Sequence, residues 1–288
     1  MRFPCSASYV KLTKGEVFYM SKYKYFFAIQ TLLPDDWQTS AEFARNLETA
    51  GKLGLDGVEL NAREPEKLDP AVLKKYLGGF GLVMSNFASG FTARTSNLSL
   101  ATEDEARRKE SVWRTTAFLA FAKEMGCGVI AGFLKGAMGD NKPANVERLK
   151  ASIAEIAPTA EKLKTPFIVE AINRFESPLG HSLEAVWELI RGCKNPYVEM
   201  LPDTYHMHIE ETDMLKAMDR FSASFTSFHL SENNRFFPGF GAVRFGEVVA
   251  QLERSGYTGK VIIEGNIKKN FIEDLRASVA YLEPILRS

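Results

Sequence analysis

The sequence has few cysteines and no long apolar run. Three cysteines occur among 288 residues, and they lie far apart and are odd in number: Cys5, Cys127 and Cys193. This pattern argues against a disulfide framework and against a zinc knuckle, and it indicates free thiols in a reducing compartment. No apolar stretch approaches the roughly 18 residues that a membrane-spanning helix needs. We therefore expect a cytoplasmic protein that makes no membrane contact.

The sequence also lacks an excess of either charge. It has 36 Lys and Arg against 36 Asp and Glu, a formal net charge of +0. A dedicated nucleic-acid binder usually carries a basic excess, so we expect no nucleic-acid partner. With 288 residues, of which 45% are hydrophobic, the chain can bury a large core. At this length one α/β barrel is commoner than two small domains.

The first residues lack the features of a signal peptide. The stretch MRFPCSASYVKLTKGEVFYM contains lysines and has no apolar core of the required length. The first strand-like pattern begins only after Met20. We interpret residues 1–22 as an N-terminal extension and residues 23–288 as a single catalytic domain. The alternative is an ordered N-terminal strand or arm, in which Tyr9 and Val10 would pack on the domain.

Eight short apolar runs rich in Val, Ile and Phe follow one another from residue 23 onward. Runs of this length and composition are typical of strands that are covered on both faces. They occupy residues 23–30, 57–61, 82–88, 128–133, 166–171, 197–203, 225–231 and 260–265.

Helical patterns separate these runs. In the third of them, Glu105 follows Thr102 at the spacing of a capping box, which predicts a helix start at Thr102. The helical patterns cover residues 40–54, 70–78, a long segment from 102, 143–163, 182–192, 213–220, 245–255 and 270–286. Eight alternations of strand and helix predict parallel pairing with right-handed crossovers, and hence an α/β protein of the (β/α)8 TIM-barrel class. An open doubly wound sheet would need a glycine-rich turn after the first strand, and TLLPDDWQ at 31–38 has no glycine.

Four consecutive runs deliver a side chain that can bind a metal. Glu170, Asp203 and Glu264 lie at the ends of the fifth, sixth and eighth runs, and His229 lies near the end of the seventh. Taken singly, each of these residues has an ordinary interpretation: a carboxylate can be a helix cap or a loop charge, and a histidine can be a core residue. Because the carboxyl ends of barrel strands meet at one face, however, we expect the four to lie together. Three carboxylates and one imidazole suit one divalent metal ion, foremost Mn, with Co, Mg or Zn as alternatives.

Further charged residues follow the same strands. Glu176, His206 and Arg235 come shortly after three of the four, where they could hydrogen-bond a polyhydroxylated ligand or be ordinary loop charges. Lys135 ends the fourth run, where an ammonium group could meet a substrate carboxylate or simply be solvated. All four would then rim one mouth of the barrel.

Four sequence motifs, which follow one another along the chain, resemble those of a known family of proteins. They are VEAINRFE (169–176), DTYHMHIEE (203–211), FHLSENNRFFPGFGAVRF (228–245) and VIIEG (261–265). Together they resemble the sugar isomerase/epimerase superfamily of xylose isomerase-like barrels. Within it, the chain is similar to the ketose 3-epimerases, which include D-tagatose/D-psicose 3-epimerases and keto-sugar-acid epimerases. The likeness covers nearly all of residues 23–286.

The resemblance implies roles for seven residues. By it, Glu170 and Glu264 are the two acid/base carboxylates of the reaction. The implied metal ligands are Glu170, Asp203, His229 and Glu264, and the implied contacts to substrate oxygens are Glu176, His206 and Arg235. The implied activity is that of an isomerase, a metal-dependent epimerase that inverts C3 of a ketose or keto-sugar acid. A small-molecule sugar or sugar acid is then the partner, and a homo-oligomer is expected because oligomers are frequent among the relatives.

This chemistry explains the choice of residues. Inverting a carbinol carbon beside a ketone requires removal of its C–H proton, and a divalent cation stabilises the enediolate that forms. One carboxylate takes the proton from one face and a second returns a proton to the other. An aldose/ketose (1,2) isomerase, such as a hydroxypyruvate-isomerase-like enzyme, would use the same site.

Two further alternatives involve other classes of protein. A DNA-repair endonuclease on this barrel would need more than the four histidines of this chain, and GFGAVRF lacks the expected Asp–x–His pair. A non-catalytic sugar-binding protein is the last alternative, and intact site residues argue against it.

Overall fold

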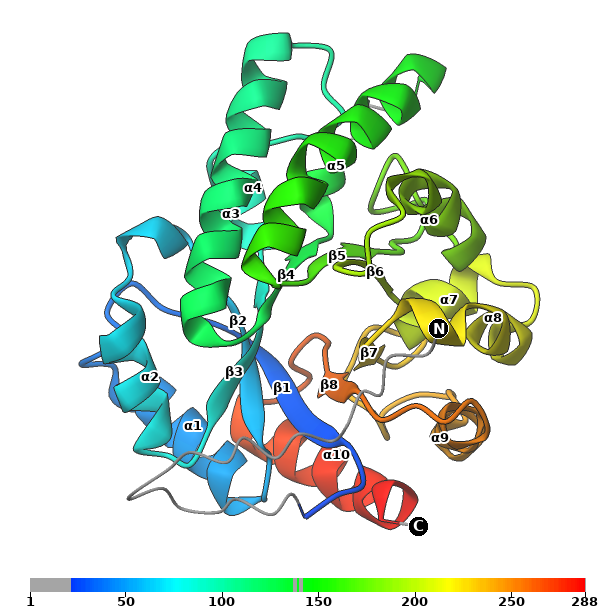
Figure 1. The fold of residues 1–288 in the computed structure, drawn as a ribbon. Coiled ribbons are helices and arrows are strands. Elements are labelled where there is room, and N and C mark those ends of the chain that lie inside the picture. The colour runs from blue at the N-terminus through cyan, green and yellow to red at the C-terminus, as the bar shows by residue number, and fades with distance from the viewer. Residues whose placement is uncertain (1–21, 137–138, 140–141, 288) are drawn as a thin grey trace.

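The computed structural model describes residues 22–136, 139 and 142–287. In this part of the chain parallel strands alternate with helices and form a nearly closed barrel, so the predicted (β/α)8 TIM barrel is confirmed (Figure 1). The strands are β1 (Phe26–Leu32), β2 (Gly57–Asn61), β3 (Val83–Ala88), β4 (Gly128–Ala131), β5 (Phe167–Glu170), β6 (Val198–Leu201), β7 (Ser227–Leu230) and β8 (Lys260–Ile263). The predicted extension lies outside the described residues except for Lys22, and the single-domain division stays a prediction.

The strands pair in the order that a barrel requires. The order is β6-β5-β4-β3-β2-β1-β8-β7, so β1 pairs with β2 on one side and with β8 on the other. Between β6 and β7 the link is an isolated parallel bridge from Asp203 to His229. Two of the predicted metal ligands therefore lie where the ring closes.

Helices cover the outside of the barrel and occupy some of its loops. They are α1 (Ala41–Lys52), α2 (Pro70–Gly78), α3 (Gly90–Thr95), α4 (Glu105–Met125), α5 (Pro143–Leu163), α6 (Leu183–Ile190), α7 (Thr204–Glu210), α8 (Met214–Phe221), α9 (Phe245–Arg254) and α10 (Phe271–Leu286). Short 3-10 helices are η1 (Pro65–Lys67), η2 (Phe133–Lys135), η3 (Arg191–Cys193) and η4 (Ser222–Ser224). Among the described residues, no helix has both the length and the apolar character that spanning a membrane requires.

The core lies between the strands and the outer helices. Phe87 of β3 is fully buried, and its ring centroid lies 5.4 Å from that of Phe118 and 6.0 Å from that of Phe121, both in α4. Helix α4 runs beside α5 (Figure 1). Because both faces of the strands are covered in this way, the strands read as continuous apolar runs.

The predicted start of the third helical segment is wrong. Helix α4 begins at Glu105, and its N-cap is Asp104, whose Oδ1 accepts hydrogen bonds from the backbone N–H groups of Ala106 at 3.0 Å and Arg107 at 3.2 Å. The Thr102 hydroxyl instead accepts from the N–H of Asp104 at 3.3 Å. The carboxylate satisfies two free N–H groups of the first turn, which a capping box at Thr102 would not reach.

Two loop helices, α3 and α7, were not predicted. Both follow strand ends directly, α3 after β3 and α7 after β6. Strands β6 and β8 end at Leu201 and Ile263, slightly before the predicted ends, so Asp203 and Glu264 lie just beyond the strands. These segments form the carboxyl-end face, where barrel enzymes carry their active sites.

Candidate active site

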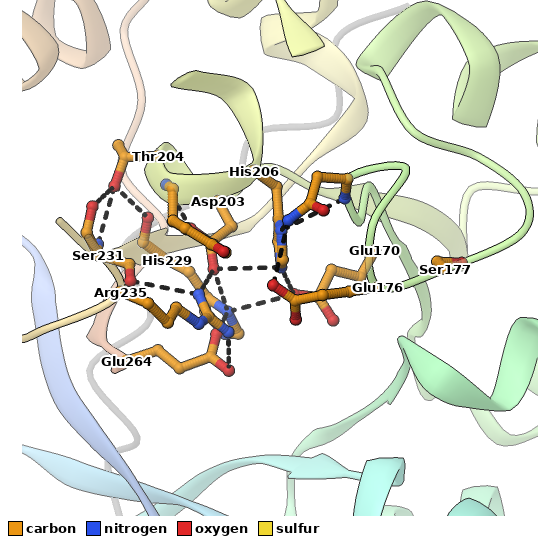
Figure 2. Close-up of polar contacts among 12 residues, drawn as sticks. Glu170, Glu176, Ser177, Asp203, Thr204, His206, His229, Ser231, Arg235 and Glu264 are labelled. Carbon is orange, nitrogen blue, oxygen red and sulfur yellow. Dashed lines mark hydrogen bonds and ion pairs between the residues drawn. The ribbon is translucent and has the colours of Figure 1, made fainter. Parts of the chain in front are cut away.

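Four side chains that can bind a metal gather at this face. Glu170 is the last residue of β5, His229 lies in β7, and Asp203 and Glu264 follow β6 and β8. One ligand atom from each lies within 4.8 Å of the others. Figure 2 shows the four side chains pointing toward one another from different elements. The structure thus brings together all four predicted metal ligands.

The imidazole of His229 lies at the centre of this cluster. Its Nδ1 is 2.5 Å from Glu264 Oε2, 3.7 Å from Glu170 Oε1 and 3.8 Å from Asp203 Oδ2. Nδ1 of His229 and Oε2 of Glu264 are buried, and neither makes a hydrogen bond of good geometry to a described residue. Buried polar atoms that make ion pairs but no hydrogen bond of good geometry need an explanation. A divalent cation shared by an imidazole and three carboxylates fits this donor set.

The cluster is electrostatically crowded. Burial is the largest cause, and together with the nearby charges of Glu264 and Asp203 it raises the pKa of Glu170 to about 8. Burial also acts to raise the pKa of Asp203, but Arg235 and His206 hold that pKa well below its usual range. A bound cation would favour the ionised form of every carboxylate here.

Arg235 bridges two of the four candidate ligands. Its Nη1 donates to Asp203 Oδ2 at 2.5 Å, and its Nη2 donates to Glu264 Oε1 at 2.6 Å. The guanidinium carbon also lies 5.0 Å from the centroid of the Tyr205 ring. Arg235 adopts a left-handed backbone with φ of 64°, which is uncommon for a residue with a Cβ. Two backbone hydrogen bonds hold this conformation: the N–H of Arg235 donates to the carbonyl of Glu232 at 2.9 Å, and its carbonyl accepts from the N–H of Asn266 at 2.6 Å.

His206 presents one ring nitrogen to the cluster. The backbone N–H of Asn173 donates to its Nδ1 at 3.3 Å, so the proton of the neutral ring sits on Nε2. Nε2 lies 3.8 Å from Glu170 Oε1 and 3.9 Å from Asp203 Oδ2. Burial lowers the pKa of His206 to about 4, so the imidazole is neutral at neutral pH.

A cavity of about 620 Å³ opens beside the cluster. Its wall includes Glu264, Arg235 and Glu176, and the Oε1 of Glu176 accepts a hydrogen bond from Asn173 Nδ2 at 3.2 Å. Phe91 and Phe133 also line this cavity. A cavity of this size with a few converging polar groups is typical of a small-molecule site.

Lys135 does not face this cavity. It is fully buried, and its Nζ donates to the backbone carbonyls of Glu170 and, at 3.4 Å, Gly180. Burial lowers its pKa to about 7. Both alternatives from the sequence, contact with a substrate carboxylate and exposure to solvent, are therefore wrong, because the Lys135 side chain is buried against backbone carbonyls of the loop that follows β5. Lys135 instead ties the two ends of that loop together.

Glu59 is a site residue that the sequence analysis missed. It lies in β2, is fully buried, and places its Oε1 3.0 Å from Nε2 of His229. Its carboxylate also accepts from Gln30 Nε2 at 3.0 Å and from Asn86 Nδ2 at 3.0 Å. Burial acts to raise the pKa of Glu59, but His229 lowers it overall. The one signal in the sequence was a carboxylate inside the apolar run GVELN.

Comparisons with known proteins agree with this architecture. The chain is 29% identical over 226 residues to a probable ketose 3-epimerase of Synechocystis sp., covering 75% of this chain and 76% of that protein. It is 26% identical over 223 residues to a ketose 3-epimerase of Arthrobacter globiformis, covering 76% of each. The crystal structure of a D-allulose 3-epimerase from Methylomonas sp. superposes with a TM-score of 0.78 at 19% identity, covering 92% of this chain and 99% of that one.

The family comparison covers most of the barrel. Residues 47–285 match the family described as xylose isomerase-like TIM barrel, and this range includes all four residues of the cluster. It also includes the segments that rim the cavity from β2 to β8. On the strength of this match, the chain belongs to the xylose isomerase-like TIM barrel family.

Proposed function

We propose that this protein is a metal-dependent epimerase that inverts C3 of a ketose or keto-sugar acid. The observation that carries the proposal is the cluster of Glu170, Asp203, His229 and Glu264 at the carboxyl-end face, with ligand atoms within 4.8 Å of one another. Similarity to ketose 3-epimerases supports the same reaction class. The choice of Mn among divalent ions, a cytoplasmic location and a homo-oligomeric state stay predictions.

Glu170 and Glu264 are the proposed acid/base pair. They come from β5 and from the end of β8, which are separated by two intervening strands in the ring, so their carboxylates approach a ligand from different walls. In the proposed reaction one carboxylate removes the proton at C3 and the other returns a proton to the opposite face. A cation held by the cluster would stabilise the charge that develops on the ketone oxygen.

The other proposed contacts orient the sugar. His206 is neutral with its proton on Nε2, so it can donate a hydrogen bond to a substrate oxygen without adding a charge. Glu176 offers a carboxylate to sugar hydroxyls from the wall of the cavity. Arg235 places a permanent positive charge beside Asp203 and Glu264. Holding the substrate in one orientation is a large part of the rate acceleration in such reactions.

The proposal predicts where deuterium enters the product. Ketoses and keto-sugar acids would be incubated in D2O with added Mn, Co or Mg, and the products followed by NMR. We expect deuterium at C3 together with the C3 epimer. An aldose product with deuterium at C1 or C2 would instead identify a 1,2-isomerase.

A further prediction concerns Glu59. Because a carboxylate behind a ligating histidine fixes the ring and raises its basicity, Glu59→Gln should weaken metal binding about 10- to 100-fold. Isothermal titration with Mn would measure the dissociation constant. Glu199→Gln is the matched control, since Glu199 lies in β6 and pairs with Thr226 instead of His229. An unchanged dissociation constant in a folded Glu59→Gln protein would contradict this role.

A further inference from the structure

A second cavity of about 440 Å³ adjoins the first. The two share Arg94, Phe133 and Glu176 in their walls, so they meet at these side chains. The second cavity lies farther along α3 and reaches the first turn of α4, where Arg107 lines it. A ligand at the candidate metal cluster would enter this space if it extended past Phe133.

Two arginines line the second cavity, and neither has an acidic partner among the described residues. The guanidinium carbon of Arg94 lies 3.6 Å from the centroid of the Phe133 ring. Within residues 22–136, 139 and 142–287, neither Arg94 nor Arg107 forms an ion pair. By contrast, Arg63 has an acidic partner. Its guanidinium carbon lies 5.0 Å from the centroid of the Phe91 ring, and its Nε lies 3.4 Å from Asp35 Oδ2. The second cavity therefore has positive charge available for a ligand.

The loop after α3 holds one of these arginines in position. Asn97 has a left-handed backbone with φ of 52°, and its carbonyl accepts a hydrogen bond from Arg107 Nε at 2.5 Å. Stacking on Phe133 likewise restricts Arg94 while leaving the edge of its guanidinium free for hydrogen bonds. Two guanidinium groups whose positions are already restricted lose little freedom when they bind an anion.

We propose that this second cavity is a subsite for a terminal anionic group of the substrate, a carboxylate or a phosphate. The inference rests on the proposed function, because it places the reacting carbons at the metal cluster and the far end of the sugar beside Arg107. Glu176 lines both cavities, whereas Arg107 lines the second, so Arg107 is the group that favours an anion there. Arginine binds both carboxylate and phosphate through paired N–H groups.

The subsite should appear as a preference among matched substrates. The Mn-loaded full chain would be assayed with a ketose that ends in an alcohol, the same ketose ending in a carboxylate, and its terminal phosphate ester. We expect kcat/KM to be about 10- to 100-fold higher for at least one anionic substrate, as charged hydrogen bonds of this kind allow. Which anion is preferred distinguishes carboxylate from phosphate.

Variants locate the source of that preference. Arg107→Met should raise KM for the anionic substrate and leave KM for the neutral ketose nearly unchanged, because Arg107 lines only the second cavity. Arg94 lines both cavities, so Arg94→Met should raise KM for the anionic substrate more than KM for the neutral ketose. Arg63→Met is the matched control, because Arg63 also stacks on a phenylalanine but already has an acidic partner. Equal losses on neutral and anionic substrates in the Arg94 and Arg107 variants would overturn the subsite.

A binding measurement separates this inference from the epimerase proposal. A sugar acid that lacks a ketone cannot react, yet it should raise the melting temperature of the wild-type protein and not that of Arg94→Met. If no ketose is epimerised but this shift is seen, the subsite stands and the proposed function fails. If ketoses are epimerised, no anion is preferred and no shift is seen, the subsite is wrong and the proposed function stands.

Discussion

Replacing either Glu170 or Glu264 with glutamine should reduce C3 epimerisation by at least about a thousandfold, toward the upper end of what a positioned acid or base contributes. Glutamine keeps the size of the side chain and removes its ability to take a proton. Both carboxylates are also members of the four-residue cluster, so each substitution additionally removes a charge from the candidate metal site. The measurement is the rate of epimer formation followed by NMR.

The two variants should also differ from each other. If Glu170 and Glu264 serve opposite faces of the sugar, each variant keeps one base and should exchange the C3 proton of only one epimer into solvent. Glu199→Gln, a substitution in β6 beside Thr226, is the matched control and should retain its rate. Circular dichroism and melting temperature would establish that each variant is folded. Near wild-type turnover in either variant would show that the two-carboxylate scheme is wrong.

Removing the divalent metal should also have a large effect on the rate of epimerisation. After dialysis against a chelator, we expect epimerisation to fall to background and to return when Mn, Co, Mg or Zn is added back. The physical reason is that three carboxylates and His229 converge on one point, where burial and the charges of the other carboxylates raise the pKa of Glu170 to about 8. A cation at this point offsets the repulsion among the carboxylates and supplies charge that the reaction needs.

Binding of the metal can be measured without activity. A metal that binds only the folded protein stabilises it by about 2.7 kcal/mol at a hundred times its dissociation constant, so the melting temperature should rise on loading. Asp203→Asn and His229→Gln should each lose most of this rise. His208→Gln is the matched control, since His208 lies exposed on α7. Full activity in chelator-treated protein shown to be free of metal would contradict the metal requirement.

The sequence was sufficient to predict the barrel and the members of its central cluster. Most residues of the strands are buried, and strands covered on both faces read as short apolar runs, which makes them visible without a structure. A charged residue at the end of such a run is equally visible, as with Glu170 after FIV or Glu264 after VII. Because parallel strands end on one face, the four predicted ligands had to lie near one another.

The tertiary structure decided which side chains meet. Glu59 contacts His229, and Lys135 folds beneath Glu170, across strands that are distant in sequence. The second cavity likewise exists because the loop after α3 packs against the start of α4. A local sequence pattern indicates whether a residue is buried, and it shows which residues lie at the carboxyl-end face of the barrel. The partner of each polar group is set by the closure of the barrel, which no local pattern encodes.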